Sequence, residues 1–392
     1  MSKYALGNLL ELKRGQDLTK NDMCKGTYPV VGSNGIIGMH NVFNVKAPCI
    51  TVGRSGTVGA VHYYNENCWA HNTCLYVSDF KNNNPLYLYY LLKNIDLTKV
   101  ATSTGVPTLN RNFVYPITTT ATANLDEQNN IANILGAIDE KIENNDAISA
   151  QLEALAKTIY DYWFLQFEFP NEDGKPYKSS GGKMVWNEEL KREIPEGWKN
   201  GNLYDIANFI NGIACQKYPP KDSVNTLPVI KINEMHNGFS AASDVVSNDI
   251  PTDVIIQNGD ILFSWSASLE AMIWNGGIGG LNQHIFHVLP KKFPKHYVFE
   301  QLAAYIVNFK IMAEARKTTT GHITTDHLKQ SKIVLPQISI ANAYEQNVRN
   351  MFDKATILKE ETLQLTSLRD FLLPLLMNGQ VTFKDKAASE EE

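Results

Sequence analysis

Arginine, amide and small hydroxyl side chains stand in several glycine-rich turns of this 392-residue sequence. Arg54 lies between Gly53 and Ser55, at the tip of a stretch (48–62) whose residue pattern predicts a β-hairpin. Arginine and hydroxyl side chains suit contacts with phosphates and base edges, and Asn or Gln can pair bidentately with adenine in the major groove. An arginine in a turn is also commonly just solvated, and polar residues suit ordinary capped loops. These turns are therefore candidates for nucleic-acid contact.

Two sets of loop residues, one in each half of the sequence, are the candidate DNA-contacting residues. In the first half they come from the hairpin, from the entry to a predicted strand (68–80) and from a polar loop (101–117). Buried packing is the alternative interpretation for the tryptophan and the histidines among them. The candidates are Arg54, Ser55, His71, Asn72, Thr104, Asn110 and Arg111 in the first half, and Trp265, Ser266, Gln283, His284, Thr320 and His322 in the second.

The sequence carries none of the catalytic motifs for which we searched. The Gly-Lys pair at 182–183 is followed by Met, so it is no phosphate-binding P-loop, and the glycines of 276–280 do not form a dinucleotide-binding fingerprint. An Asn-Pro-Pro-aromatic run, typical of amino-methyltransferases, is absent. Residues 173–175 (Asp-Gly-Lys) resemble part of a nuclease signature, but chance explains so short a match better. We therefore expect no catalytic residues in this chain.

A zinc site is the sharpest alternative among the possible chemistries. Cys68, His71 and Cys74, perhaps with Cys49, are ligand types that zinc favours. Their spacing is unusual, and a strand would turn alternate side chains to opposite faces. The corresponding residues of the second half are Gly279, Asn282, Ile285 and Asp260, which do not make a ligand set. We expect no metal site.

One long helix is predicted over 125–163, where apolar residues recur at three- and four-residue spacing. Such a helix would span roughly 60 Å. The pattern is broken where Asn145 takes a seam position. The apolar seam consists of Ile131, Ile134, Leu135, Ile138, Ile142, Ile148, Leu152, Leu155, Ile159 and Tyr162. A second helix of this kind is predicted over 344–380, and a shift of 217 residues lays the first on the second. Two such helices suggest pairing with each other.

The segments that precede the helices also align, which predicts a tandem duplication of one globular module and one helix. A shift of 211 sets 48–56 on 259–267 and 71–77 on 282–288. A shift of 216 sets 102–117 on 318–333, and a shift of 194 sets Gly-Asn-Leu at 7–9 on the same residues at 201–203. The order of the blocks is the same in both copies.

Charge is unevenly distributed along the chain. The net charge is −5, yet residues 1–120 hold 11 Lys or Arg against 6 Asp or Glu, whereas residues 121–196 hold 7 against 15. A polyanion would therefore meet the modules rather than the helices, although solvated faces also explain acidic helices. The sequence has no apolar run of membrane-spanning length and no signal-peptide core. Its five cysteines do not form the pattern of a disulfide framework, so we expect a cytoplasmic protein.

Several long stretches resemble type I restriction-modification specificity (S) subunits. Residues 137–182 (AIDEKIENN…DGKPYKSSGG) look like the central conserved region of that family, and residues 365–381 (LTSLRDFLLPLLMNGQV) look like its distal conserved region. IPEGW at 194–198, followed by GNLYDIANFINGIA, resembles the opening of a second target-recognition domain, and 259–288 also resembles this family. The resemblance covers nearly the whole chain, but the first copy lacks an upstream IPEGW.

The resemblance implies an α+β fold with two tandem α/β target-recognition domains, each followed by a long helix. The two helices would pair as an antiparallel coiled coil with a pseudo-two-fold axis. We also expect residues 164–196, rich in Pro, Gly and charge, to form an exposed linker. The expected division is target-recognition domain 1 at 1–120, a central conserved helical region and linker at 121–185, target-recognition domain 2 at 186–336, a distal conserved helix at 337–383 and a disordered tail at 384–392.

The resemblance also implies a non-catalytic subunit that recognises double-stranded DNA. Each globular domain would read one half of a bipartite, asymmetric site, while the helices set the half-site spacing and dock two modification subunits. Those partners would use S-adenosylmethionine to methylate adenine N6, and restriction subunits would add cleavage that depends on ATP and Mg, so this chain would bind no cofactor. The candidate docking residues lie near the helix ends and are Tyr160, Trp163, Phe164, Leu372 and Leu375, although core packing explains the leucines equally well.

Two other hypotheses remain open at this point. The chain could be a coiled-coil protein–protein scaffold or adaptor whose modules bind no DNA. A self-sufficient enzyme is disfavoured by the missing motifs. Because phosphate contacts release counterions, a steep salt dependence of DNA binding would separate the leading hypothesis from the scaffold.

Overall fold

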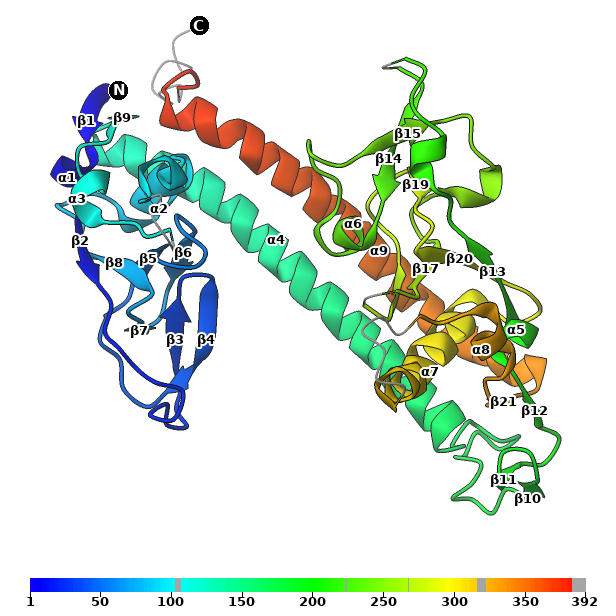
Figure 1. Cartoon of the computed structure of the whole chain (residues 1–392). Helices are drawn as coiled ribbons and strands as arrows, with labels where there is room; N and C mark the ends of the chain where they lie inside the picture. Colours follow the sequence, from blue (N-terminus) through cyan, green and yellow to red (C-terminus); the bar gives the residue numbers. More distant parts are fainter. Residues whose placement is uncertain (103–106, 223, 267, 316–321, 383–392) are drawn as a thin grey trace, which may run out of the picture. The chain divides into compact units, whose positions relative to one another are not determined.

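The computed structural model describes residues 1–102, 107–222, 224–266, 268–315 and 322–382, and its contacts divide the chain into two compact units. Unit 1 comprises Met1–Ile142 with Gln364–Glu392, and unit 2 comprises Glu143–Leu363. Two long helices, α4 (Leu125–Tyr160) and α9 (Ile338–Met377), each contribute to both units (Figure 1). The predicted domain boundaries and pseudo-two-fold axis stay predictions, and the predicted tail lies outside the described residues.

Unit 1 is built around a four-stranded antiparallel sheet in the order β2-β8-β5-β6. A smaller sheet in the order β4-β3-β7 pairs β3 with β7 in parallel, and β1 pairs with β9. Helix α2 packs on β6. The strands of this unit are β1 (Ser2–Ala5), β2 (Glu11–Arg14), β3 (Tyr28–Gly32), β4 (Gly35–His40), β5 (Cys49–Gly53), β6 (Val61–Tyr64), β7 (Trp69–Ala70), β8 (Cys74–Asp79) and β9 (Thr118–Ala121); its other helices are α1 (Leu6–Leu9), α2 (Pro85–Lys93), α3 (Arg111–Val114) and a 3₁₀ turn (Leu97–Val100).

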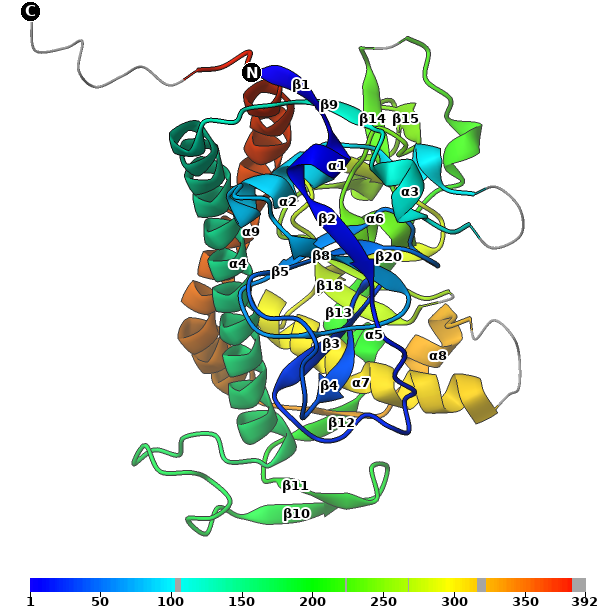
Figure 2. The same cartoon turned by 90° about the vertical axis from the view of Figure 1, so that its left-hand side faces the viewer.

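Unit 2 repeats this plan with a four-stranded sheet in the order β13-β20-β17-β18. A second sheet has the order β15-β14-β19-β16, β12 pairs with β21, and β10 and β11 form a hairpin beside the end of α4 (Figure 2). The strands are β10 (Met184–Asn187), β11 (Arg192–Pro195), β12 (Lys199–Gly201), β13 (Ala207–Asn211), β14 (Thr226–Ile230), β15 (Val245–Ser247), β16 (Ile255–Ile256), β17 (Ile261–Ser264), β18 (Glu270–Ile273), β19 (Gly279–Leu281), β20 (Ile285–Pro290) and β21 (Ile333–Leu335); the helices are α5 (Leu203–Ile206), α6 (Ile232–Asn237), α7 (Lys295–Ala315), α8 (Thr325–Lys329) and 3₁₀ turns at Cys215–Lys217 and Thr252–Val254.

The predicted duplication is confirmed by the order of the strands in the two larger sheets. Strand β8 begins at Cys74 and β20 begins at Ile285, which is the predicted shift of 211. The predicted shift of 194 near the start is wrong, because the short helices α1 and α5 begin at Leu6 and Leu203, a shift of 197. Leu6 and Leu203 are both fully buried, so packing sets this correspondence and the three-residue sequence match does not.

The two long helices pair antiparallel inside each unit, as predicted. In unit 1, Arg369 of α9 donates to Asp139 of α4 at 2.8 Å. In unit 2, Asn145 is 1% exposed and its amide donates to the Glu361 carboxylate at 2.8 Å, while Lys359 pairs with Glu153. A buried polar side chain of this kind fixes the register of paired helices.

The predicted apolar seam of α4 is wrong at three positions. Ile134, Ile148 and Leu155 are 39%, 44% and 48% exposed, whereas Asn145, Ser149 and Ala156 face α9 and are buried. A heptad pattern shows which residues share one helix face, but it does not show which face meets the partner helix within the chain. The apolar residues with this spacing are left on the surface.

The linker is mostly exposed, as its composition predicted, but a few buried aromatic residues anchor it to the core of unit 2. After α4 the chain makes a π-helical turn (Asp161–Leu165) and then buries Phe167, Phe169 and Trp198 at 2%, 5% and 6% exposure. The rings of Phe169 and Trp198 stack with centroids 5.0 Å apart. These aromatic contacts stabilise a segment for which the Pro, Gly and charged residues predicted only solvent exposure. Within the described residues, no helix has the length and apolar character that crossing a bilayer requires.

Candidate nucleic-acid interface

Three loops of unit 1 meet around Arg54. The backbone N–H groups of Arg54 and Ser55 donate to the Thr73 carbonyl at 2.8 and 3.1 Å, and the Arg54 carbonyl accepts from Leu109 N–H at 2.8 Å. A side chain at Gly53 would lie 2.0 Å from the Thr57 carbonyl oxygen, so only glycine fits this tight turn. The hairpin tip, the β7–β8 loop and the loop before α3 are thus held together.

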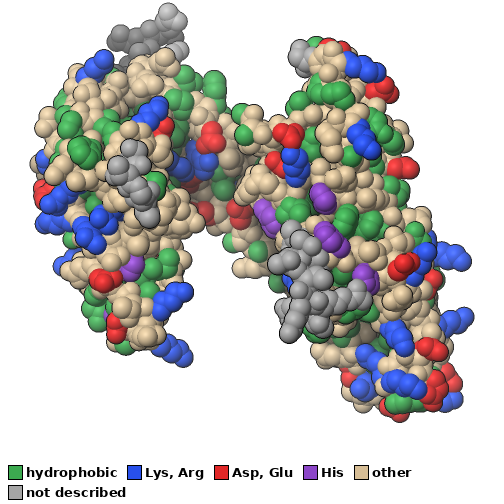
Figure 3. Space-filling model, in the orientation of Figure 1, with side chains coloured by type: hydrophobic (Ala, Val, Ile, Leu, Met, Phe, Trp, Pro, Cys, Tyr) green, Lys and Arg blue, Asp and Glu red, His purple; other side chains and the backbone are tan. Residues whose placement is uncertain are grey.

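Three cations, Arg54, Arg14 and Arg111, lie near this meeting point, and Arg14 was not singled out by the sequence. Strand β2 ends at Arg14. Burial lowers the pKa of Arg54, and the positive charge of Arg14 lowers it further. Arg111 donates to the Leu12 carbonyl at 3.0 Å, which places it over the same strand. Lys13 precedes Arg14 on β2, is exposed and lies 4.0 Å from the Glu11 carboxylate. Lys and Arg side chains gather on the face of unit 1 seen in Figure 3.

The remaining candidates of unit 1 surround this cluster. His71 Nδ1 lies 2.9 Å from the Thr73 hydroxyl, and the Asn72 amide donates to Asp17 at 2.7 Å. The Asp17 carboxylate is therefore engaged by Asn72. Asn110 is exposed and its side chain caps α3 by accepting from Asn112 N–H at 3.0 Å. Thr104 lies outside the described residues.

Unit 2 builds the same junction around Trp265. Its N–H donates to the His284 carbonyl at 3.3 Å, and its carbonyl accepts from Ile323 N–H at 3.1 Å. A shift of 211 relates Arg54 to Trp265 and Thr73 to His284, as predicted. The loop before the last short helix instead follows a shift of 214, from Leu109 to Ile323, so the predicted shift of 216 is two residues too long there.

The side chains at this second junction are aromatic rather than basic. The Trp265 indole N–H donates to Asn211 at 3.0 Å, and its ring lies 5.6 Å from the His284 ring and 5.5 Å from that of His322. Histidine side chains gather on the face of unit 2 seen in Figure 3. Gln283 is half-buried, and its Nε2 lies 3.5 Å from Nε2 of His284. Ser266 is buried, and Thr320 lies outside the described residues.

Asn211 and Arg14 are the site residues that the sequence patterns missed. Arg14 pairs with Leu75 across the sheet, and Asn211 pairs with Phe286, so the two occupy the same place at the end of β2 and β13. The shift that relates them is 197, the same as for α1 and α5. The predicted shift of 194 sets Arg14 on Asn208 instead, three residues before its structural counterpart.

The docking residues predicted on α4 lie in the core of unit 2. Tyr160, Trp163 and Phe164 are 0%, 8% and 4% exposed, and the Phe164 ring packs against Tyr297 and Tyr344. Side chains so deeply buried offer a partner almost no surface, so core packing replaces docking for these three. Leu372 and Leu375 of α9 are half-buried, and their docking role stays a prediction.

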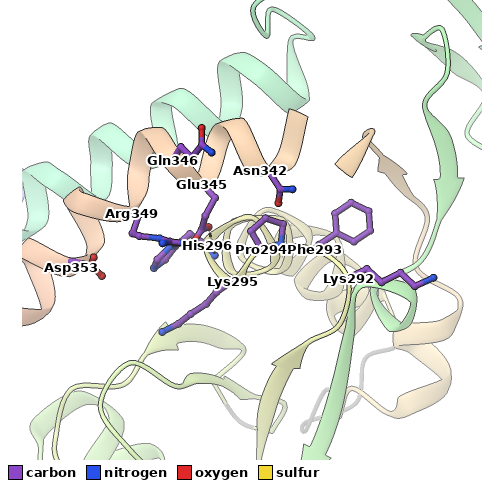
Figure 4. A pocket seen from close by; sticks show the side chains of 10 residues that line it. All are labelled: Lys292, Phe293, Pro294, Lys295, His296, Asn342, Glu345, Gln346, Arg349 and Asp353. Atoms are coloured by element: carbon purple, nitrogen blue, oxygen red, sulfur yellow. Dashed lines mark hydrogen bonds and ion pairs between the residues drawn. The ribbon is translucent and has the colours of Figure 1, made fainter. Parts of the chain in front are cut away.

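A cleft of about 620 Å³ lies between α7 and α9 in unit 2 (Figure 4). His296 and Glu345 point toward each other across it, with Nδ1 2.9 Å from the carboxylate, and both side chains are buried. Burial alone would raise the pKa of Glu345, but the hydrogen bond and charge of His296 lower it overall. His296 also stacks on Phe352 at 4.2 Å. The pair joins the start of α7 to α9.

The cysteines of unit 1 do not gather around His71. Cys49 and Cys68 lie with their sulfurs 2.6 Å apart, whereas Cys74 donates to backbone carbonyls, and burial raises its pKa to about 12. The His71 ring faces Thr73 instead. In the part of the chain that the structure describes, no three His, Cys, Asp or Glu side chains are placed to hold a metal ion.

Comparison with known proteins identifies the family of this duplicated fold. The family described as "Type I restriction modification DNA specificity domain" matches residues 1–154 and 195–363. The chain is 22% identical over 318 residues to the type I restriction enzyme MjaIX specificity subunit of Methanocaldococcus jannaschii, covering 76% of this chain and 69% of that protein. It is 23% identical over 316 residues to the HindI specificity subunit of Haemophilus influenzae, covering 65% and 67%.

A solved structure shares the fold over nearly the full length. The crystal structure of the type I restriction-modification S subunit from M. genitalium superposes with a TM-score of 0.60 at 18% identity, covering 98% of this chain and 96% of that one. At this identity the likeness shows the fold, and the family match over both modules shows the lineage. The chain belongs to the type I restriction-modification DNA specificity family and carries two tandem copies of its domain.

Proposed function

We propose that this chain is the DNA-recognition subunit of a type I restriction-modification complex, in which each unit reads one half of a bipartite DNA site. One observation carries the proposal: the same three-loop junction is built twice, with different side chains at the same place. Arg54 and Trp265 occupy equivalent, doubly anchored backbone positions. A constant scaffold with variable side chains suits two half-sites of different sequence.

The proposed role is recognition, with the chemistry on partner subunits. Modification subunits would transfer a methyl group from S-adenosylmethionine to adenine N6, and restriction subunits would use ATP and Mg, so this chain would hold no cofactor. It would act in the cytoplasm, where its DNA is. The family match favours this role over a coiled-coil scaffold without DNA binding.

We propose that a modification subunit binds an exposed stripe of unit 2 that runs along α4 into the π-helical turn after it. Ile148, Leu155 and Tyr162 recur at seven-residue spacing and are 44%, 48% and 40% exposed. Apolar side chains at this spacing suit packing by a helix of another protein. Changing Ile148 and Leu155 to Ser should abolish co-purification with the modification subunit and leave unfolding unchanged, because neither side chain is buried.

The experiment for the main proposal is co-expression with the cognate modification subunit, followed by genome-wide mapping of N6-methyladenine. One split motif, with two short half-sites and a fixed gap, is the expected result. Binding of the purified complex to DNA carrying that motif should weaken steeply as salt rises. If a soluble, assembled complex produced no methylation and did not bind DNA, the scaffold hypothesis would replace this proposal.

A further inference from the structure

We infer that Arg54 reads a guanine in the half-site bound by unit 1, and that unit 2 has no equivalent contact because Trp265 stands there. The inference rests on the proposed function and names a specificity-determining residue within it. It predicts one guanine in the first half-site whose recognition depends on a single side chain. Its support comes from the anchoring, the charge and the unused donors of Arg54.

The backbone of Arg54 is fixed from two sides. Its N–H and its carbonyl bond to Thr73 and Leu109, which belong to two other loops, and Gly53 permits the tight turn before it. The side chain is half-buried among these loops. A contact to one base needs a donor whose position is set in advance, whereas a phosphate contact tolerates a freely moving chain. The geometry therefore favours a base over a phosphate.

The guanidinium of Arg54 has donors to spare. Its one hydrogen bond within the described residues is a long one, from Nη1 to the Asn72 carbonyl at 3.5 Å. In the same part of the chain no carboxylate lies within ion-pairing distance of it, and Asp17 is held by Asn72 instead. The positive charge of the nearby Arg14 repels the Arg54 guanidinium. A half-buried cation beside another cation is stabilised by acceptor atoms from outside the protein.

Guanine offers the acceptors that this group fits. The arginine fork presents two parallel N–H donors, which match O6 and N7 of guanine in the major groove. No other base presents two acceptors on that edge. The exposed Lys13 and Arg14, at the end of β2, are better suited to phosphates, because they are not enclosed by loops.

Unit 2 serves as an internal contrast. The single donor of the Trp265 indole is already used by Asn211 at 3.0 Å. What remains is the apolar surface of the Trp265 ring, which has two histidine rings beside it. That surface can pack against a thymine methyl group but cannot donate to guanine. The same backbone position thus supports two different kinds of readout.

Methylation mapping of variants tests the inference. Arg54→Ala, co-expressed with the modification subunit, should make one guanine position of one half-site degenerate, with discrimination falling about tenfold to a hundredfold. Arg54→Gln should shift the preference at that position toward adenine, and the other half-site should not change. Lys13→Ala is the matched control, and it should lower methylation evenly without altering the motif.

A base analogue tests the same contact without relying on a variant's folding. Replacing the guanine by 7-deazaguanine removes the N7 acceptor and should weaken binding of the wild-type complex about tenfold, while Arg54→Ala should be insensitive to it. An unchanged motif in Arg54→Ala, an even loss across all positions, or no effect of the analogue would each overturn the inference. These outcomes leave the proposed function intact, since that fails only if wild-type protein directs no bipartite methylation.

Discussion

Gln128 in unit 1 and Glu345 in unit 2 hold equivalent places on the two long helices, yet they anchor their units by different chemistry. A shift of 217 relates them, as the sequence predicted. Gln128 accepts from Asn84 N–H at 2.8 Å, and its amide donates to Asn83 and the Thr122 carbonyl, both at 2.8 Å. Glu345 accepts from His296 N–H at 3.2 Å and from its ring. In each unit this contact joins the start of another helix, α2 or α7, to a long helix. An amide side chain makes it in unit 1, and a carboxylate makes it in unit 2.

The comparison teaches that duplicated positions are not interchangeable once their neighbours have diverged. The amide of Gln128 faces two carbonyl-type oxygens and needs its N–H groups. The carboxylate of Glu345 faces donors only, which suits an acceptor without protons. Each residue is correct only for the set of partners around it.

The largest expected effect comes from Gln128→Glu. The new carboxylate would be fully buried against the Asn83 and Thr122 oxygens, which repel it, so unit 1 should lose about 3–5 kcal/mol at pH 8. Peptide-resolved hydrogen exchange would locate the loss in unit 1. Gln128→Met is the control of similar size without charge, and it should cost less. Lowering the pH to 5 should restore part of the stability, because the protonated acid can donate; equal loss in both variants would contradict the account.

The second largest effect on stability is expected from Glu300→Gln, which removes a buried acidic group from α7 of unit 2. Burial raises the pKa of Glu300 to about 7, from an ordinary value near 4.5. Because the folded state holds the proton more tightly, the contribution to stability is fully present below about pH 4.5 and is lost as pH rises through 7. Glu300→Gln should therefore stabilise unit 2 by about 3 kcal/mol at pH 8 and hardly at all at pH 4.5. Denaturant unfolding followed by tryptophan fluorescence would report unit 2, where five of the six tryptophans lie.

Glu345→Gln should have a smaller effect than its unit 1 counterpart. The amide can still accept from His296 N–H, but the charge-assisted bond to the ring is weakened, so we expect a loss of about 1–2 kcal/mol at pH 7. Because the pKa of Glu345 is lowered in the fold, the wild-type advantage should disappear as pH falls below about 4.5. A loss as large as that of Gln128→Glu would show that charge does not distinguish the two anchors.

The smallest expected effect is that of Asn145→Ala. It removes the hydrogen bond to Glu361 and a longer one to the Leu358 carbonyl, and should cost about 1 kcal/mol. Thr362, the equivalent residue of α9, is half-buried and serves as the matched comparison. Thr362→Ala should cost less than half as much in the same fluorescence-detected unfolding experiment. A reversed order would mean that Asn145 does not fix the helix pairing.

The sequence predicted those parts of the fold that have strong local patterns. Strands β8 and β20, and the pairing of α4 with α9, follow from hydrophobic periodicity, which needs no knowledge of distant contacts. Phe167 and Phe169 were misjudged because their burial depends on Trp198, a residue of another segment. Ile148 and Leu155 were misjudged because periodicity cannot tell an internal partner from an external one. The equivalence of Arg54 and Trp265 was predicted, but that of Arg14 and Asn211 was not, because the shift predicted near the start is three residues too short.

The Gln128 anchor also bears on how such chains can be recombined. Its partners Asn83, Asn84 and Thr122 precede it by up to 45 residues, on the module side. A gene crossover between codons 84 and 122 would separate Gln128 from Asn83 and Asn84, and one between codons 122 and 128 would separate it from Thr122 as well. The amide would then face residues of another protein that did not evolve with it. A crossover after codon 128, inside α4, would carry the complete set to the new host. Grafts that exchange the first unit should therefore be joined within the helix, beyond Gln128, rather than at residue 120.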